Sequence, residues 1–380
     1  MNTARIAIVG GGLSGLYAAW LLEQKGLGDY VLLEARDVPG GRIVSAPVIL
    51  PPGASDLAVA DNINRFDLGP SWFWPEFQPE LDRLVHDLGL ERFEQFETGD
   101  MMVERWPAES AMRVRGFASV PSPKRIAGGM AALTDALLRG VDAMRVLTGR
   151  TVRRLRSVGM QVEVDSQDAT GRIETWRVEH VLLAIPPRLV EQRIEFEPAL
   201  PRAQAKQWRA TPTWMAPHAK YVAVYDTPFW REQGLSGAAR SARGPLGEIH
   251  DASVPGGSCA LFGFFGVSAR DRRRTPENVL RSHCRAQLAR LFGPQAARPT
   301  VDFIKDWAAE PYTATVADQD HSDHDATPPP ATIPSAPWAG CVTGIASEWA
   351  LRFPGYVAGA IEAAGLGVEA LAERANEEMP

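Results

Sequence analysis

The sequence predicts an α/β fold with a parallel sheet, and three observations near its start support this class. Residues 6–9 form an uninterrupted apolar run of the kind found in buried strands. A glycine-rich turn follows, and then an Ala- and Leu-rich stretch at 16–25 that has the composition of a helix. A second apolar run at 31–33 supplies the next strand. Strand, helix and strand in this order form a βαβ unit, in which the two strands run parallel.

The turn between the first strand and the helix has the spacing G-x-G-x-x-G, from Gly10 to Gly15. Gly10 permits the tight turn, Gly12 lets a pyrophosphate approach the backbone, and Gly15 lets the helix pack closely on the strand. The amino end of the helix, with Leu13 and Ser14, would then meet the phosphates. The spacing therefore predicts a dinucleotide site, and an ordinary βαβ turn is the alternative.

Glu34 ends the second strand, where an acidic residue would accept hydrogen bonds from a ribose diol. NAD and FAD both use such a unit, so the following residues must decide between them. The stretch Glu34-Ala-Arg-Asp-Val-Pro-Gly-Gly-Arg42 resembles its counterpart in the flavin amine oxidase superfamily, which includes monoamine and polyamine oxidases, L-amino acid oxidases and protoporphyrinogen oxidases. The resemblance implies that the cofactor is FAD, with contacts from Ala35 and Arg36 and, at the diphosphate and flavin end, from Gly41 and Arg42.

A later block, Asp-Leu-Gly-Pro-Ser-Trp-Phe-Trp-Pro at 67–75, is similar to the family segment that passes the flavin ring. Pro70 stands where the family has a glycine. The resemblance implies cofactor contacts from Gly69, Ser71 and Trp72.

Three further elements match the FAD-binding part of the same family. Residues 127–138 resemble the helix by which the chain re-enters this part, and a strand is predicted at 150–156. By the resemblance, Val152 in that strand touches the adenine through its backbone. A buried strand is predicted at 178–185, where the paired prolines that follow end it, because proline cannot continue a central ladder.

Residues 340–360 resemble the carboxy-terminal flavin-binding stretch of the family. Glu348 aligns with a glutamate near the ribityl and phosphate groups, and Ala346 replaces a glycine. Tyr356 matches one tyrosine of the monoamine oxidase aromatic cage. With Val357 it begins a small-residue helix whose amino end would face the flavin. For Tyr356, an aromatic ring packed at a helix start is the alternative.

Lys220 is the first candidate catalytic residue. Period-2 alternation places it in a strand at 219–225, on the face of Val222 and Val224. This pattern alone favours a solvated lysine. However, the stretch from Lys220 to Trp230 resembles the monoamine oxidase stretch whose lysine reaches flavin N5 through a water. An ammonium there would stabilise the negative charge that forms as oxygen takes an electron.

The block Trp-Ala-Ala-Glu-Pro-Tyr at 307–312 also resembles the family, and Trp307 and Tyr356 join Lys220 as candidate catalytic residues. Val316 lies at the position of the cysteine that tethers the flavin in monoamine oxidases, and Ala317 at that of the second cage tyrosine. The resemblance therefore implies non-covalent FAD and a cage that lacks one tyrosine.

Composition is that of a globular chain of about two domains, with 380 residues and 45% hydrophobic content. The net charge of −6 argues against a nucleic-acid partner, and the arginine-rich cluster at 270–274 is expected to be a solvated loop or helix start. Apolar stretches end well before about 18 residues, and the amino terminus enters a strand directly. We therefore expect a cytoplasmic protein without a membrane partner. The sequence leaves open whether the protein forms a homodimer.

No metal site is predicted. The run Asp-His-Ser-Asp-His-Asp at 320–325 precedes three prolines and lacks a structured ligand spacing, which favours a solvated loop. The three cysteines lack metal-like or C-x-x-C spacing, which argues against a disulfide reductase and predicts reduced thiols at Cys259, Cys284 and Cys341.

The sequence thus predicts a Rossmann-like FAD-binding domain interleaved with a mixed α+β substrate domain, as in monoamine oxidases. The expected reaction is hydride removal from a carbon that bears an amine, giving an imine that water hydrolyses, with O2 reoxidising the flavin to yield H2O2. A small-molecule amine and O2 are the expected partners. Two alternatives stay open: desaturation of a C–C or ring C–N bond, as in phytoene desaturase and protoporphyrinogen oxidase relatives, and a flavin-binding protein without turnover. The expected FAD-binding pieces are 1–70, 122–212 and 306–380, and the substrate-domain pieces are 71–121 and 213–305.

Overall fold

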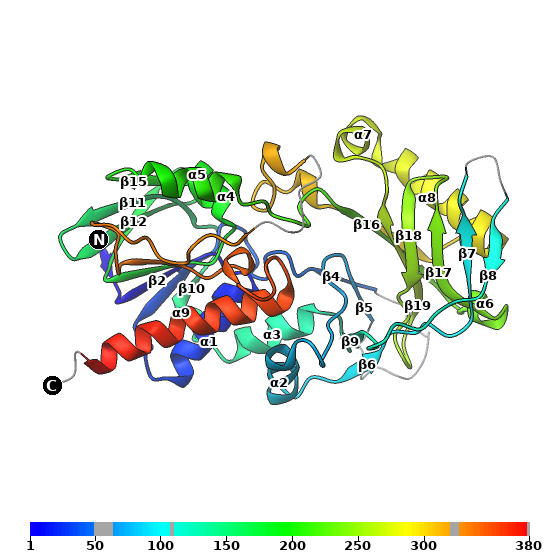
Figure 1. Ribbon diagram of the computed structural model, residues 1–380, viewed down its shortest axis with the longest axis horizontal. Coiled ribbons are helices and arrows are strands. Elements are labelled where there is room, and N and C mark those ends of the chain that lie inside the picture. The colour runs from blue at the N-terminus through cyan, green and yellow to red at the C-terminus, as the bar shows by residue number, and fades with distance from the viewer. Residues whose placement is uncertain (49–63, 107–109, 320–326, 378–380) are drawn as a thin grey trace. The chain divides into compact units, whose positions relative to one another are not determined.

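A computed structural model of the chain describes residues 1–48, 64–106, 110–319 and 327–377 (Figure 1). The predicted α/β class is confirmed, because parallel and mixed sheets alternate with helices along the chain. The chain forms two compact units. The first unit contains Met1–Ile43, Leu133–Met215 and Pro311–Pro380, and the second contains Val44–Ala132 and Ala216–Glu310.

These units differ from the predicted domain boundaries. Residues 44–70 and 122–132, predicted within the FAD-binding part, belong to the second unit, and so do 306–310, whereas 213–215 belong to the first. Hydrogen bonds explain the largest difference, because Asp67 Oδ1 accepts from Met130 N at 2.7 Å and from Ser45 Oγ at 2.6 Å. The two segments are therefore fastened to each other within one unit.

The first unit is built on a five-stranded parallel sheet. Its central strands are buried at every position and, apart from His180, have apolar or aromatic side chains, as expected for strands covered on both faces. The predicted strands at 6–9 and 31–33 are confirmed. The strand order is β10 (Val146–Leu147), β3 (Tyr30–Leu33), β2 (Ile6–Val9), β14 (His180–Leu183) and β21 (Val342–Gly344).

A second sheet of the first unit is mixed, with parallel pairs at its two edges and antiparallel pairs between them. Its strand order is β1 (Asn2–Thr3), β13 (Ile173–Val178), β12 (Gln161–Gln167), β11 (Thr151–Val158) and β15 (Glu195–Glu197). The predicted strand at 178–185 is therefore wrong at its start, because Val178 ends β13 and β14 begins at His180.

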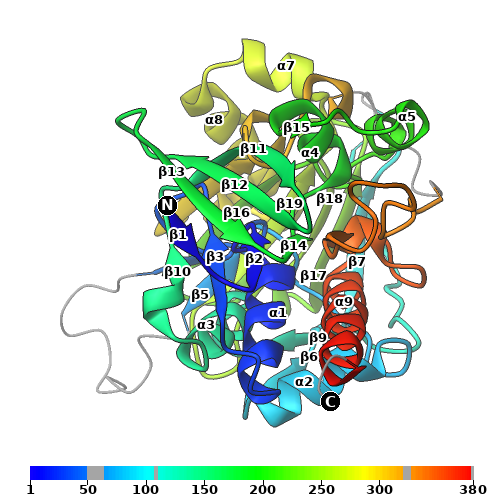
Figure 2. The same cartoon turned by 90° about the vertical axis from the view of Figure 1, so that its left-hand side faces the viewer.

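Helices of the first unit include α1 and α9, which pack side by side (Figure 2). Most of α3 also belongs to this unit. The helix predicted at 127–138 begins later, at Ala131, because Gly128 and Gly129 have φ values of +80° and +74°. The helices are α1 (Leu13–Gln24), α3 (Ala131–Arg139), α4 (Pro187–Arg193), α5 (Arg202–Ala210) and α9 (Val357–Glu377), with short 3₁₀ turns η1 (Ala143–Arg145), η4 (Val316–Asp318) and η5 (Ser347–Trp349).

The second unit is built on a seven-stranded sheet, antiparallel except where β17 meets β7. Its order is β20 (Val301–Asp306), β16 (Ala219–Tyr225), β19 (Cys259–Phe265), β18 (Leu246–Asp251), β17 (Leu235–Ser241), β7 (Asp100–Glu104) and β8 (Met112–Val114). Two ribbons accompany it, β4 (Ser45–Pro47) with β5 (Arg65–Asp67) and β6 (Arg92–Glu94) with β9 (Lys124–Ile126).

Helices α2 (Pro79–Asp87), α6 (Phe229–Glu232), α7 (Ala269–Arg274) and α8 (Glu277–Phe292), with η2 (Pro294–Ala297) and η3 (Trp307–Ala309), complete this unit. Arg272 in α7 departs from the expected solvated cluster. It is buried, and its guanidinium donates to both carboxylate oxygens of Asp306 at 2.8 Å. Within the described residues, no helix has both the length and the apolar character needed to cross a bilayer.

Candidate functional site

The glycine turn after β2 is shaped by contacts that leave no room for side chains. Gly10 has a φ of +105°, and a Cβ on Gly15 would lie 1.9 Å from the carbonyl oxygen of Gly10. Gly12 and Gly41 approach so closely that a Cβ on Gly41 would lie 2.9 Å from the Cα of Gly12. The glycine turn and the Gly41 end of the stretch 34–42 therefore meet backbone to backbone, and Gly12 and Gly41 are each only half-buried.

Helix α1 begins at this turn with uncapped amide groups. Gly12 is its N-cap, provides no side-chain hydrogen bond, and the first turn, which includes Leu13 and Ser14, carries no acidic residue. The first four N–H groups of a helix lack intrahelical partners, and together with the helix dipole they favour an anion. The geometry fits a pyrophosphate group at this position.

Glu34 follows β3 and is held by two backbone amides. Gly11 N donates to its Oε2 at 2.6 Å, and Arg36 N donates to its Oε1 at 2.8 Å. These contacts orient a buried carboxylate, and each carboxylate oxygen keeps a lone pair for a hydroxyl donor. Arg150 N also donates to Glu34 O at 2.8 Å, which places the start of β11, with Val152, beside Ala35 and Glu34.

Arg42 and Glu348 form an ion pair that joins two predicted cofactor blocks far apart in the sequence. Arg42 Nη1 donates to Glu348 Oε1, and Nη2 donates to Oε2 at 3.1 Å and to Ser347 Oγ at 3.2 Å. The bidentate geometry fixes both side chains. Glu348 is buried, whereas Arg42 is partly exposed. The structure therefore gives Arg42 a protein partner in addition to its predicted role at the cofactor.

Tyr356 lies directly before α9 and packs against Trp214, a residue that no sequence motif predicts. Their ring centroids are 4.8 Å apart with an interplanar angle of 42°, and both rings are half-buried. Burial raises the pKa of Tyr356. Trp214 lies in the loop between α5 and β16, where no periodicity or motif marks an individual residue, so nothing in the sequence pointed to it.

Lys220 is the most unusual side chain of the second unit. Only 2% of it is exposed, although the pattern alone favoured a solvated lysine. Its Nζ donates to Ser71 Oγ at 2.6 Å and to Gly69 O at 3.1 Å, and lies 4.1 Å from the ring centroid of Phe262. Among the described residues, no carboxylate forms an ion pair with it. The pKa of Lys220 is lowered to about 7, mainly by burial; the charge of Asp67 opposes this shift, and that of Arg125 adds to it.

Trp307 lies beside the same segment of chain as Lys220. Its Nε1 donates to Leu68 O at 3.0 Å, and its backbone N donates to His218 O at 3.0 Å. Trp72 follows Ser71, and its Nε1 donates to Gln95 Oε1 at 2.8 Å. The segment 68–72 thus gathers five predicted site residues of the second unit: Gly69, Ser71, Trp72, Lys220 and Trp307.

The remaining predicted residues gather in the first unit around the glycine turn, the Arg42–Glu348 pair and the start of α9. They are Gly10, Gly12, Leu13, Ser14, Gly15, Glu34, Ala35, Arg36, Gly41, Arg42, Val152, Glu348, Tyr356 and Val357.

The segment with Val316 and Ala317 is fixed by a buried acid. Asp318 accepts hydrogen bonds from Thr315 N at 2.8 Å, from Thr213 N at 3.1 Å and from Arg188 Nη1. Val316 itself is 83% exposed. A valine offers no thiol for a covalent bond to flavin, as the sequence implies.

Metal binding has no support in the described part of the chain, where no three His, Cys, Asp or Glu residues cluster suitably. The acidic and histidine-rich run at 320–325 lies outside the described residues.

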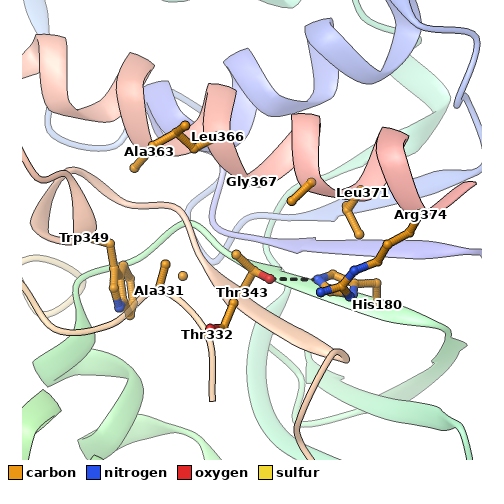
Figure 3. Close-up of a pocket in the computed structure, with 12 residues that line it drawn as sticks. His180, Ala331, Thr332, Thr343, Trp349, Ala363, Leu366, Gly367, Leu371 and Arg374 are labelled. Atoms are coloured by element: carbon orange, nitrogen blue, oxygen red, sulfur yellow. Dashed lines mark hydrogen bonds between the residues drawn. The ribbon is translucent and has the colours of Figure 1, made fainter. Parts of the chain in front are cut away.

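A small cavity of about 140 Å³ in the first unit contains none of the predicted site residues. It lies between α9 and β21, and Figure 3 shows Arg374 of α9 next to His180. His180 Nε2 is 3.0 Å from Thr343 Oγ1. Burial, followed by the charge of Arg374, lowers the pKa of His180 to about 4, and a hydrogen bond with the Gly340 backbone opposes the shift.

His180 should therefore make folding stability depend on pH. The unfolded state binds this proton below about pH 6.5 and the folded state only below about pH 4, so stability falls as the pH drops through this window, by about 3 kcal/mol in total. Urea unfolding at a series of pH values would measure the difference between the native protein and His180→Gln. A difference that stays constant from pH 7 to pH 4 would contradict the prediction.

Two profiles of known protein families match this chain. A family profile described as "Flavin containing amine oxidoreductase" matches residues 108–371, and one described as "NAD(P)-binding Rossmann-like domain" matches residues 8–88. Similar curated proteins include "Putrescine oxidase" from Kocuria rosea, 30% identical over 206 residues, and "Probable flavin-containing monoamine oxidase A" from Dictyostelium discoideum, 28% identical over 192 residues. Each match covers 50% of this chain and only 41% and 40% of the respective relative.

Solved structures share the fold along nearly the whole chain. Putrescine oxidase bound to putrescine gives a TM-score of 0.77 at 21% identity, and the match covers 98% of this chain and 99% of the other. Cyclohexylamine oxidase from Brevibacterium oxydans IH-35A gives 0.78 at 20% identity with the same coverage. At these identities the likeness concerns the fold.

Proposed function

This chain belongs to the flavin-containing amine oxidoreductase family, and on that premise we propose that it oxidises a small-molecule amine with non-covalently bound FAD. The first unit would hold the cofactor, and the second would supply Lys220 and Trp307. FAD, when bound, accepts the hydride from the carbon that bears the amine. Water would then hydrolyse the imine product, and O2 would be reduced to H2O2.

Three features of the first unit fit FAD. The uncapped start of α1 suits the pyrophosphate, and Gly12 and Gly41 place no side chain beside it. The carboxylate of Glu34 suits the diol of a ribose. Glu348, with Arg42 bound to it, would lie at the ribityl end by the family resemblance.

The observation that carries the proposal is the burial of Lys220 without an ion-pair partner among the described residues. A buried ammonium without a counter-charge destabilises a folded protein, so a lysine here is difficult to explain by packing. Strongly perturbed groups of this kind are typical of functional sites. A protonated Nζ carries three N–H groups, and its contacts with Ser71 and Gly69 use two of them.

We propose that Lys220 uses its charge on the oxygen side of the reaction. An ammonium in a dry pocket stabilises negative charge that develops as O2 takes an electron, because charges interact strongly where water is excluded. Its third N–H would position the water that hydrolyses the imine.

Anaerobic mixing of the purified protein with primary amines, polyamines, amino acids and cyclic amines would test the proposed function. We expect one class to bleach the flavin absorbance, and air to restore the colour rapidly. Slow return of colour would indicate an acceptor other than O2. Flavin that no amine bleaches would contradict amine oxidation and favour the desaturase or non-catalytic alternatives.

A further inference from the structure

A cavity of about 190 Å³ lies within the second unit, on the seven-stranded sheet. Its walls are rich in aromatic side chains, and five ionisable groups also line it. The aromatic residues are Trp72, Trp74, Phe96 and Phe117, and the ionisable residues are Glu97, Arg240, Glu248, His250 and Asp251.

Two of the three carboxylates in this cavity are neutralised by protein cations. Asp251 accepts from Arg231 through both oxygens at 2.8 Å. Glu248 pairs with Arg240 at 2.6 Å and with His250 at 2.7 Å. Burial raises the pKa of Glu248, but the contacts with His250 and Arg240 outweigh burial and lower it overall. The negative charges of Asp251 and Glu248 are therefore already neutralised by neighbouring side chains of the protein.

Glu97 is the exception. Its oxygens accept from Ser119 N at 2.7 Å and Ser119 Oγ at 2.8 Å, and neither donor is charged. Among the described residues, no Lys, Arg or His forms an ion pair with Glu97. The carboxylate is half-buried and held in place by its two hydrogen bonds. The cavity therefore carries one negative charge that described residues do not balance.

Sheet register places this cavity on the same face as Lys220. Lys220 of β16 lies opposite Phe264 of β19, and Phe264 lies opposite Glu248 of β18. Directly paired residues project from the same face of a sheet. Two strand spacings separate Lys220 from Glu248, about 10 Å at the backbone.

Aromatic rings fill the distance between the two positions. The ring centroid of Trp72 lies 5.3 Å from that of Phe262 and 4.8 Å from that of His250. Lys220 Nζ lies over the same Phe262 ring. Phe264 also lies between them: Lys220 Nζ is 5.6 Å from its ring centroid, and the Trp72 centroid is 6.5 Å from it. Phe262 is buried, whereas Trp72 and Phe264 are half-buried.

We propose that this cavity binds a second cationic group of the amine substrate, so that the enzyme prefers amines with an additional ammonium or guanidinium group away from the reacting nitrogen. The inference rests on the proposed function. Aromatic faces attract organic cations, and Glu97 supplies the unmatched charge. The half-buried rings of Trp72 and Phe264, which lie between Lys220 and the cavity, suit the methylene chain that joins the two nitrogens.

Binding of non-oxidisable cations to the flavin-loaded protein would test the subsite without turnover. Calorimetry would compare hexamethonium, which has two quaternary ammonium groups, with hexyltrimethylammonium, which has one. We expect the dication to bind about tenfold tighter or better, and Glu97→Gln to remove most of that preference. Glu91→Gln, an exposed change of the same kind on the same stretch of chain, is the matched control and should leave it intact.

Equal affinity for the two probes, or a preference that Glu97→Gln leaves unchanged, would overturn the inference. Steady-state kinetics would distinguish failure of the cation subsite from failure of the proposed function. A linear diamine should show a higher kcat/KM than the alkylamine of equal length, and Glu97→Gln should lower that ratio mainly through KM. If amines bleach the flavin but show no such preference, the subsite is wrong and amine oxidation stands. If no amine bleaches the flavin while the dication still binds through Glu97, the proposed function fails and the cation site stands.

Discussion

Replacing Lys220 with Met is expected to stabilise the protein and, at the same time, to slow the reoxidation of its flavin by O2. The side chain is buried, and burial lowers its pKa from 10.5 to about 7. That difference corresponds to a destabilisation on the order of 4 kcal/mol at pH 7 and below. Methionine has a similar volume and no charge, so the variant should regain much of this free energy.

The pH dependence of this stabilisation has a defined sign. Between pH 7 and about pH 10.5 the unfolded state binds more protons at this lysine than the folded state, so the stability of the native protein rises with pH. The advantage of Lys220→Met should therefore be largest at or below pH 7 and vanish toward pH 10.5. Urea unfolding at matched FAD concentration would measure it.

Although Lys220→Met should raise stability, it should lower the rate at which O2 reoxidises the flavin. If the ammonium stabilises the developing negative charge, its loss should slow the reaction with O2 by roughly 10²–10³-fold, the usual effect of removing one electrostatic stabiliser. In the native protein the rate should fall as the pH rises through about 7, and this dependence should be absent from the variant. Lys206→Met is the control, because Lys206 is exposed on α5. Unchanged reoxidation in Lys220→Met would remove this lysine from the mechanism.

Replacing Gly15 with Ala is expected to destabilise the cofactor-binding turn severely. The added Cβ would lie 1.9 Å from the Gly10 carbonyl oxygen and 3.3 Å from the Ala184 Cβ. Backbone atoms cannot move aside as a flexible side chain does, so α1 must shift away from β2. We expect a loss of about 3 kcal/mol or more in unfolding free energy, at the upper end for overpacking. FAD affinity should fall with it, since the same shift moves the start of α1.

Gly365→Ala in α9 is the matched control, since it is the same substitution in a helix where nothing lies within 4 Å of the new Cβ. Alanine there should stabilise by about 0.5–1 kcal/mol, because glycine is the poorer helix former. Thermal unfolding and the flavin content of the purified variants would measure both effects. Equal stability of the two variants would show that the close contact at Gly15 does not constrain the turn.

Local sequence was sufficient for the βαβ unit. The strands at 6–9 and 31–33, the glycine turn and the position of Glu34 follow from apolar runs and fixed spacings. The helix predicted at 127–138 begins only at Ala131, because two glycines with positive φ precede it. Residue type alone does not reveal whether a glycine continues a helix or breaks it.

Contacts between segments far apart in the sequence determined the surroundings of the candidate site residues. Period-2 alternation placed Lys220 on a strand face, but only the packing of β16 between β19 and β20, beside the segment that carries Gly69 and Ser71, buries it. The pairing of Arg42 with Glu348 and the contact of Trp214 with Tyr356 likewise join residues far apart in sequence.

The sequence by itself determined the fold class, the family resemblance and the positions of the cofactor-binding motifs, because these depend on short-range periodicity and spacing. Only the tertiary structure decided which charged side chains have a partner of opposite charge. The burial of Lys220 and the unbalanced carboxylate of Glu97 depend on which segments of the second unit converge around each side chain, and no local pattern encodes that convergence.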